Sequence, residues 1–115
     1  MAENLLRKVD IDWLLSIYGA MLTDKQREIA TLYFEEDLSL AEIAQQENVS
    51  RQSIHDTLQR VEKQLRTWEE KLGIRDKLTR VQTSLETALE EIDKDQSSAR
   101  NIIEKAIRLL NDEED

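Results

Sequence analysis

The segment from Leu38 to Ile54 constrains the fold more than any other part of the chain. Two short helices joined by a tight turn need a small residue at their crossing, a turn residue that tolerates positive φ, apolar residues after the turn and a cap on the second helix. The segment supplies these features in order, as Ala44, Asn48, Val49 with Ile54, and Ser50. We therefore predict a helix-turn-helix over residues 38–61, with Val49, Ile54 and Leu58 facing inward. An ordinary helical hairpin that meets these spacings by accident is the alternative.

The scarcity of turn-forming residues predicts the fold class. Proline is absent from the 115 residues, and glycine occurs only at Gly19 and Gly73. An α/β or all-β chain of this length would need more turn-formers. Charged residues make up 36% of the sequence and aromatic residues only 4%, which is typical of long helices with salt-bridged faces. We therefore predict an all-α fold whose core is mainly Leu, Ile, Val and Ala.

Helical spacing and capping residues divide the N-terminal part into four helices. The first is indicated by apolar residues on one face, which are Val9, Trp13, Leu14, Ile17 and Tyr18. Capping boxes mark the starts of the next two helices, as Thr23 with Gln26 and Ser39 with Glu42. The second helix should end near residues 35–37. The fourth should be long, because an apolar seam with heptad spacing follows Ser50, formed by Ile54, Leu58, Val61, Leu65, Trp68 and Leu72.

A second apolar seam follows Gly73, and the polar stretch 93–98 interrupts it. We expect a helix-turn-helix domain over residues 1–72, with a long recognition helix, and a C-terminal helical hairpin with an acidic tail over residues 73–115. The hairpin has too few large apolar residues to be stable alone, so it must pack on the first domain, on a second copy or on a partner. Packing on the long fourth helix is the simplest choice. The residues expected at this oligomer or partner interface are Leu65, Trp68, Leu72, Leu78, Val81, Leu85 and Leu89.

The outer face of the fourth helix is the candidate nucleic-acid interface, because a helix-turn-helix presents the N-terminal part of its second helix to the major groove. We call the following residues the contact face: Ser50, Arg51, Gln52, His55, Asp56, Gln59 and Arg60. Arg51 could read guanine and Gln52 could read adenine. Asp56 would repel phosphate, and the other interpretation of Asp56 and Arg60 is an ion pair on the helix surface.

The charge of the chain argues against tight DNA binding by a monomer. The formal net charge is −9, so a duplex repels the chain at long range. Residues 51–66 carry three Arg and one Lys against one Asp and one Glu, which is basic relative to the rest but is not a strong patch. The contact face therefore binds DNA, or it binds RNA or protein, or it is only a scaffold.

Catalysis, metal binding and membrane insertion find little support. Cysteine is absent, so disulfides and thiolate metal sites are excluded. His55 is the only histidine, and the acidic cluster at residues 35–37 has no other ligands at matching spacing, so we expect no metal and no cofactor. No catalytic motif stands out, and we expect no enzyme. No apolar run approaches the ~20 residues of a membrane span, and no signal peptide is evident, so we expect a cytoplasmic protein.

The run from Tyr18 to Leu72 resembles the YlxM family of small bacterial helix-turn-helix proteins. The matching pieces include Leu22-Thr23-Asp24-Lys25-Gln26-Arg27, Glu42-Ile43-Ala44 and Val49-Ser50-Arg51-Gln52. The family usually has Ala-Val-Tyr-Asp next, where this chain has Ser53-Ile54-His55-Asp56. The same part also resembles region four of bacterial sigma factors, which implies a helix-turn-helix of three to four helices, winged-helix-like or sigma region-four-like. The resemblance implies a regulatory role in the signal recognition particle (SRP) pathway, through the particle's RNA, proteins or GTPase, and no catalytic residue.

Three hypotheses follow for the function. The first is a non-enzymatic helix-turn-helix regulator linked to the SRP pathway. The second is a DNA-binding transcriptional regulator that acts as a homodimer. The third is a helical interaction module that binds a protein partner through its apolar seams.

Overall fold

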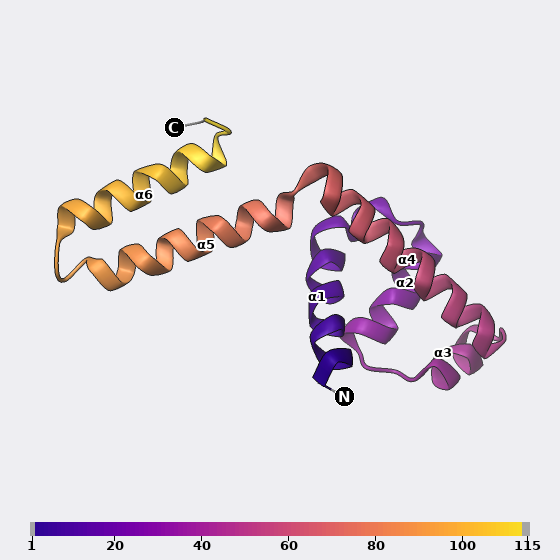
Figure 1. Cartoon of the computed structure of the whole chain (residues 1–115). Coiled ribbons are helices and arrows are strands. Elements are labelled where there is room, and N and C mark those ends of the chain that lie inside the picture. The colour runs from indigo at the N-terminus through magenta and orange to yellow at the C-terminus, as the bar shows by residue number, and fades with distance from the viewer. Residues whose placement is uncertain (1, 114–115) are drawn as a thin grey trace. The chain divides into compact units, whose positions relative to one another are not determined.

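The computed structural model describes residues 2–113, with side chains from residue 7 onward. Within these residues every regular element is a helix, which confirms the predicted all-α class. The chain divides into two compact units, Met1–Leu72 and Gly73–Asp115 (Figure 1). We call them the head and the hairpin, and each is described by itself.

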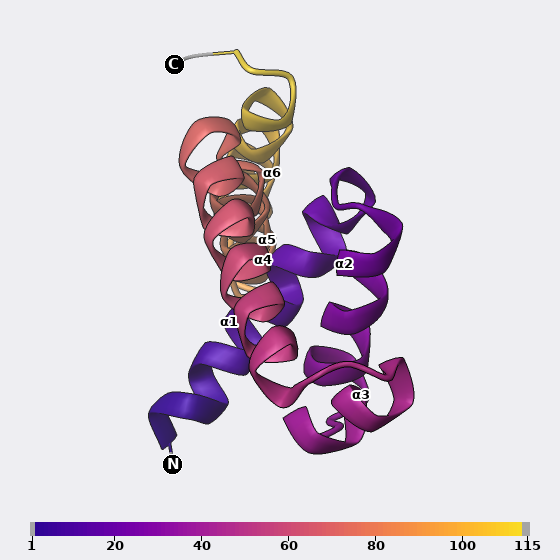
Figure 2. The same cartoon turned by 90° about the vertical axis from the view of Figure 1, so that its right-hand side faces the viewer.

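The head contains four α-helices and two short helical segments of other types. The α-helices are α1 (Ala2–Tyr18), α2 (Asp24–Ala30), α3 (Leu40–Glu47) and α4 (Arg51–Leu72). A 3-10 helix, η1 (Gly19–Met21), follows α1, and a π-helix, η2 (Thr31–Glu35), continues α2. Figure 2 shows the turn that leads from α3 into the start of α4.

The local signals for helix starts and turns are present as predicted. Thr23 and Ser39 each form a complete capping box, with Gln26 and Glu42 respectively. Asn48 has a φ of 57° and ends α3 in the left-handed region, which Asn tolerates better than most residues. These caps satisfy backbone groups that the helix ends would otherwise leave unpaired.

Two apolar cores hold the head together, and α4 contributes to both. The first core joins α1 to the middle of α4 and contains Ile11, Leu14, Leu15, Tyr18, Leu22, Ala30, Val61 and Leu65. The second joins α2, α3 and the start of α4 and contains Ile29, Ile43, Ala44, Ile54 and Leu58. Phe34, which is half-buried, packs against both cores. Val9, on the predicted apolar face of α1, is 62% exposed, whereas Ile11 is fully buried in the first core.

The π-helix η2 was not anticipated, since the sequence predicted one continuous α-helix to residues 35–37. Its wider turn places two aromatic rings edge to face, with the centroids of Tyr33 and Phe34 5.0 Å apart. The ammonium group of Lys8 lies 4.1 Å from the centroid of the Tyr33 ring. Through Tyr33 the π-helix η2 contacts α1, and through Phe34 it contacts both cores.

The hairpin consists of α5 (Ile74–Glu91) and α6 (Gln96–Leu110). Gly73, with a φ of 61°, precedes α5, and the Asp95 side chain caps α6 by accepting from the backbone N–H groups of Ser97 and Ser98. The two helices bury small side chains against each other, which are Val81, Ala88, Ala99 and Ala106. Of the predicted seam, Val81 packs between the two helices, whereas close approach on small residues leaves Leu78, Leu85 and Leu89 exposed.

Candidate nucleic-acid interface

The contact face lies on the outer side of the first turns of α4. All of its residues are exposed, whereas Ile54 and Leu58, on the same turns, are buried in the second core. The Ser50 hydroxyl oxygen accepts a hydrogen bond from the backbone N–H of Ser53, 3.0 Å away, and so caps the helix. The structure therefore brings the predicted contact residues together on one accessible surface.

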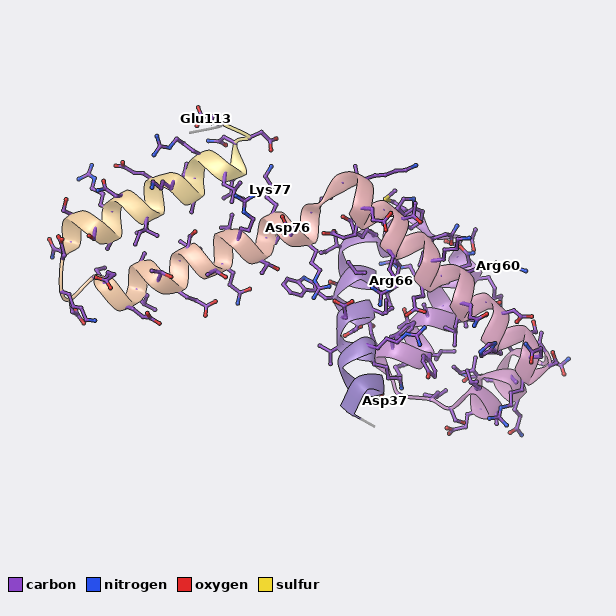
Figure 3. All side chains as sticks on the ribbon, in the orientation of Figure 1. Asp37, Arg60, Arg66, Asp76, Lys77 and Glu113 are labelled. Carbon is purple, nitrogen blue, oxygen red and sulfur yellow. The ribbon has the colours of Figure 1, made fainter. Side chains whose placement is uncertain are left out.

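The two arginines of the contact face lack the ion pairs that several other cations of the head form. Within residues 7–113, neither Arg51 nor Arg60 forms an ion pair, and Figure 3 shows Arg60 pointing away from α4. The paired cations elsewhere in the head are Arg7 with Glu62, Lys8 with Asp37, Lys25 with Glu28 and Glu47, and Arg66 with Asp10 and Glu62. Positive charge in an acidic chain is thus available where a helix-turn-helix would use it.

Asp56 interacts within the contact face, and its expected pair with Arg60 is not formed. The Gln52 amide donates a hydrogen bond to the Asp56 carboxylate, with Nε2 and Oδ1 2.9 Å apart. The same carboxylate lies 3.7 Å from Nδ1 of His55. One of the two N–H groups of the Gln52 amide is therefore occupied by Asp56, while its second N–H and its carbonyl oxygen can still contact a ligand.

Val49 does not face inward, contrary to the expectation from the motif. Its exposed fraction is 46%, and its backbone N–H donates to the carbonyl oxygen of Ala44, 3.0 Å away. This hydrogen bond closes the turn around Asn48 and directs Val49 outward beside the contact face. Ile54 alone provides the buried apolar residue of the first turn of α4.

A groove of about 500 Å³ lies along the flank of α4, and nothing in the sequence pointed to it. Its walls come from α1, η2, the start of α3 and α4, and are formed by Arg7, Lys8, Tyr33, Phe34, Asp37, Leu40, His55, Leu58, Gln59 and Glu62. His55 and Gln59 belong to both the groove and the contact face. Contacts between α1 and α4 form this groove, so only the tertiary fold reveals it.

The charged groups of the groove neutralise one another. Arg7 donates a hydrogen bond from Nε to Oε1 of Glu62, 2.6 Å away. This bond is the main reason that the pKa of Glu62 lies below its ordinary value, and partial burial opposes the shift. Lys8 and Asp37 form a second pair, 3.3 Å apart. The groove therefore offers aromatic and apolar surface rather than net charge.

The residues expected at the oligomer or partner interface have different environments. Leu65 is fully buried in the first core, so it is not available to a partner. Trp68 is half-buried on the same core, with its ring 6.4 Å from that of Tyr18, and Val81 is buried between α5 and α6. The remaining predicted interface residues are exposed, which are Leu72, Leu78, Leu85 and Leu89.

The described residues also bear on metal binding and membrane insertion. They contain no group of three or more acidic or imidazole side chains arranged to hold a metal ion. No described helix is both long enough and apolar enough to cross a membrane.

An all-helical head with a positive-φ turn between α3 and an exposed α4 defines a helix-turn-helix protein. Residues 5–109 match the UPF0122 family, described as "Putative helix-turn-helix protein, YlxM / p13 like". The chain belongs to this family, which confirms the resemblance drawn from the sequence.

Relatives of the chain carry the same family name. A UPF0122 protein of Clostridium botulinum is 44% identical over 85 residues, covering 74% of this chain and 78% of the relative. A UPF0122 protein of Clostridium perfringens is 38% identical over 108 residues, covering 90% of this chain and 96% of the relative. A UPF0122 protein of a Thermoanaerobacter species is 52% identical over 61 residues, covering 53% of this chain and 52% of the relative.

Proposed function

We infer that this protein is a non-enzymatic regulatory protein of the cytoplasm that binds nucleic acid through the contact face of α4. One observation carries this proposal: the exposed start of α4 presents Arg51 and Arg60 without ion pairs, whereas Arg7, Lys8, Lys25 and Arg66 of the same head are paired with carboxylates. Leaving such charges unpaired is useful when they are to meet phosphate or a guanine edge.

The proposed context is the SRP pathway, with the particle's RNA and proteins as partners. This part of the proposal rests on the resemblance to the YlxM family. With a net charge of −9, the chain gains little affinity from unspecific attraction to phosphate. A structured RNA is therefore the better target, because recognition of its shape adds affinity to that of the small basic contact face.

The test measures binding of the full chain to two labelled probes, a transcribed SRP RNA and a DNA duplex of mixed sequence. Replacing Arg51 and Gln52 together by alanine should weaken binding to the preferred probe roughly 10- to 100-fold, because each removes a donor suited to a base edge. The variant should also show a shallower loss of affinity with salt, since one cation fewer displaces counterions.

A matched control comes from the other end of the same helix. Lys71 and Gln64 are exposed on α4 and lie outside the contact face, so replacing both by alanine removes the same kinds of group. This control should bind as the unaltered chain does, and circular dichroism should show equal helix content in both variants. Unchanged binding of both probes after the loss of Arg51 and Gln52 would rule the contact face out.

A second candidate is a DNA-binding regulator that acts as a dimer. The large apolar residues exposed on the hairpin favour it, because a second copy could cover them. It predicts two contact faces about 34 Å apart, one duplex turn, and a duplex footprint with two half-sites. A footprint with a single half-site at saturation would count against it.

A further inference from the structure

The groove beside α4 is continuous with the contact face. His55 and Gln59 belong to both, so a ligand that lies along the contact face borders the groove. The volume of about 500 Å³ falls within the ~300–1,000 Å³ that is typical of sites for small molecules. The groove therefore has room for a group that projects from a ligand bound to the contact face.

Two aromatic rings form the centre of the groove wall. Tyr33 and Phe34 lie edge to face, and the ammonium group of Lys8 lies 4.1 Å from the centroid of the Tyr33 ring. This face of the ring is therefore in contact with a polar group on a long, flexible side chain. The other partner of Lys8 is Asp37, whose side chain is 81% exposed, and such a surface pair contributes little stability. A flat aromatic group can take the place of the ammonium at low cost.

The charges of the groove favour a neutral occupant. Arg7 and Lys8 balance Glu62 and Asp37, and each cation is paired with a carboxylate. A phosphate would have to break these pairs, whereas a neutral heterocycle leaves both in the groove. The Gln59 amide offers a donor and an acceptor to the polar edge of such a ring.

An available cation lies on the groove side of α4. Successive residues of a helix are about 100° apart, so Arg51, His55, Leu58 and Glu62 fall within about 60° of one another around the axis. Within residues 7–113, Arg51 is exposed and forms no ion pair. Arg51 is therefore placed to bind the phosphate of a nucleotide whose base enters the groove.

We propose that the groove binds one unpaired nucleobase of an RNA, stacked on the Tyr33 ring in the place of the Lys8 ammonium, while the same RNA lies on the contact face. The proposal rests on the function proposed above and names its target class, an RNA with a bulged or looped-out nucleotide. Base edges are hard to reach in the deep, narrow major groove of an RNA duplex, so proteins recognise RNA mainly at unpaired bases. Stacking adds affinity without further cations, which suits a chain with a net charge of −9.

Binding of the full chain to two RNA hairpins that differ only by one bulged uridine tests the proposal. We expect the bulged hairpin to bind roughly 10-fold more tightly, because one base stacks on an aromatic ring. Tyr33→Leu should abolish this preference and leave the affinity for the paired hairpin unchanged, whereas Tyr33→Phe, which keeps the ring, should retain it. Trp13→Leu is the matched control, since it removes a half-buried ring that does not line the groove.

Photochemical cross-linking of the unaltered chain provides a readout that does not depend on the folding of a variant. The bulged uridine is replaced by 5-iodouridine, which on irradiation forms a covalent bond to an aromatic ring stacked against it. Mass spectrometry of tryptic peptides should locate the cross-link at Tyr33. The cross-link should disappear in Tyr33→Leu, and circular dichroism should show the helix content of the unaltered chain.

Two results would overturn this inference and leave the proposed function intact. One is equal affinity for both hairpins, with binding that still depends on Arg51 and Gln52. The other is a cross-link found only outside the groove. An apolar protein segment as the true occupant would give equal affinities and no cross-link at Tyr33. Failure of both hairpins to bind would instead overturn the proposed function, and this inference with it.

Discussion

At the residue scale, Asn48 is the position where backbone conformation most restricts the side chain. Its φ of 57° lies in the left-handed region, where Asn and Gly are tolerated and β-carbons of other residues are strained. We predict that Asn48→Ala lowers the free energy of unfolding by about 1 kcal/mol, whereas Asn48→Gly changes it by less than about 0.5 kcal/mol. Urea denaturation followed by circular dichroism measures both.

The neighbouring helix provides the control for this prediction. Gln46 is exposed on α3, and its replacement by alanine should leave the urea midpoint unchanged or raise it slightly. Equal destabilisation by Ala and Gly at position 48 would show that the side chain, rather than the backbone angle, matters there.

Which single residues could be predicted from the sequence depends on how local their constraint is. Thr23, Ser39 and Asn48 act on backbone groups within four residues, so their spacing alone predicted the caps and the turn. Val49 was predicted to face inward and is exposed, and Val9 is exposed although it lies on the predicted apolar face of α1. The burial of a side chain depends on which other helices pack beside it, and residue spacing does not encode that packing.

At the element scale, two ion pairs join α1 to α4, Arg7 with Glu62 and Arg66 with Asp10. Arg7 donates to Glu62, and Arg66 lies 3.6 Å from the same carboxylate. The pKa of Glu62 is lowered from its ordinary value of 4.5, so its charged form stabilises the folded head above that pH. The contribution is lost as the pH falls through the lower pKa of the folded state.

We therefore predict a pH-dependent effect of Glu62→Gln. The variant should be less stable than the unaltered chain by about 1 kcal/mol at neutral pH, because a partly exposed charged hydrogen bond is lost. The difference should shrink as the pH falls below 4.5, where the unfolded carboxyl is protonated. Thermal melts from pH 7 to pH 3 measure it, and a difference that persists undiminished at pH 3 contradicts the assigned cause.

The elements themselves could be predicted better than their packing. The four helices of the head were expected, yet the π-helix η2 was not, because nothing in residues 31–35 distinguishes it from an α-helix locally. The wider turn of η2 contains Phe34, and this side chain packs against both cores of the head. In the hairpin, heptad spacing predicted both helices but could not show that Ala88 rather than Leu89 faces α6.

At the scale of the whole molecule, the total charge of −9 says little about any one face. Cations that form ion pairs with carboxylates are not available to a ligand. Which cations form such pairs follows only from the tertiary structure. The sequence thus predicted that the contact residues share one exposed side of a helix and that Leu78, Leu85 and Leu89 are available to a partner, whereas it did not predict the groove beside α4 or the pairing of its charges. The groove and its ion pairs depend on which helices lie next to each other.

The two units should differ in how their stability responds to concentration. The dimeric second candidate predicts that hydrogen exchange in α5 and α6 slows as the protein concentration rises, because a second copy would cover the exposed leucines of the hairpin. Exchange in the core of α1 and α4 should stay the same. Mass spectrometry of peptic fragments after exchange at two concentrations measures this, and equal protection of the hairpin at both would contradict it.

The sharing of α4 between two cores restricts the changes that its gene can accept. Ile54 and Leu58 belong to one core, and Val61 and Leu65 to the other, on one uninterrupted helix. Inserting or deleting a single codon between Leu58 and Val61 would rotate one half by about 100° against the other, so that one of the two cores would lose its apolar contacts. Changes of length should therefore be accepted in the connection before α3 or in the loop of the hairpin, while α4 evolves by substitution alone.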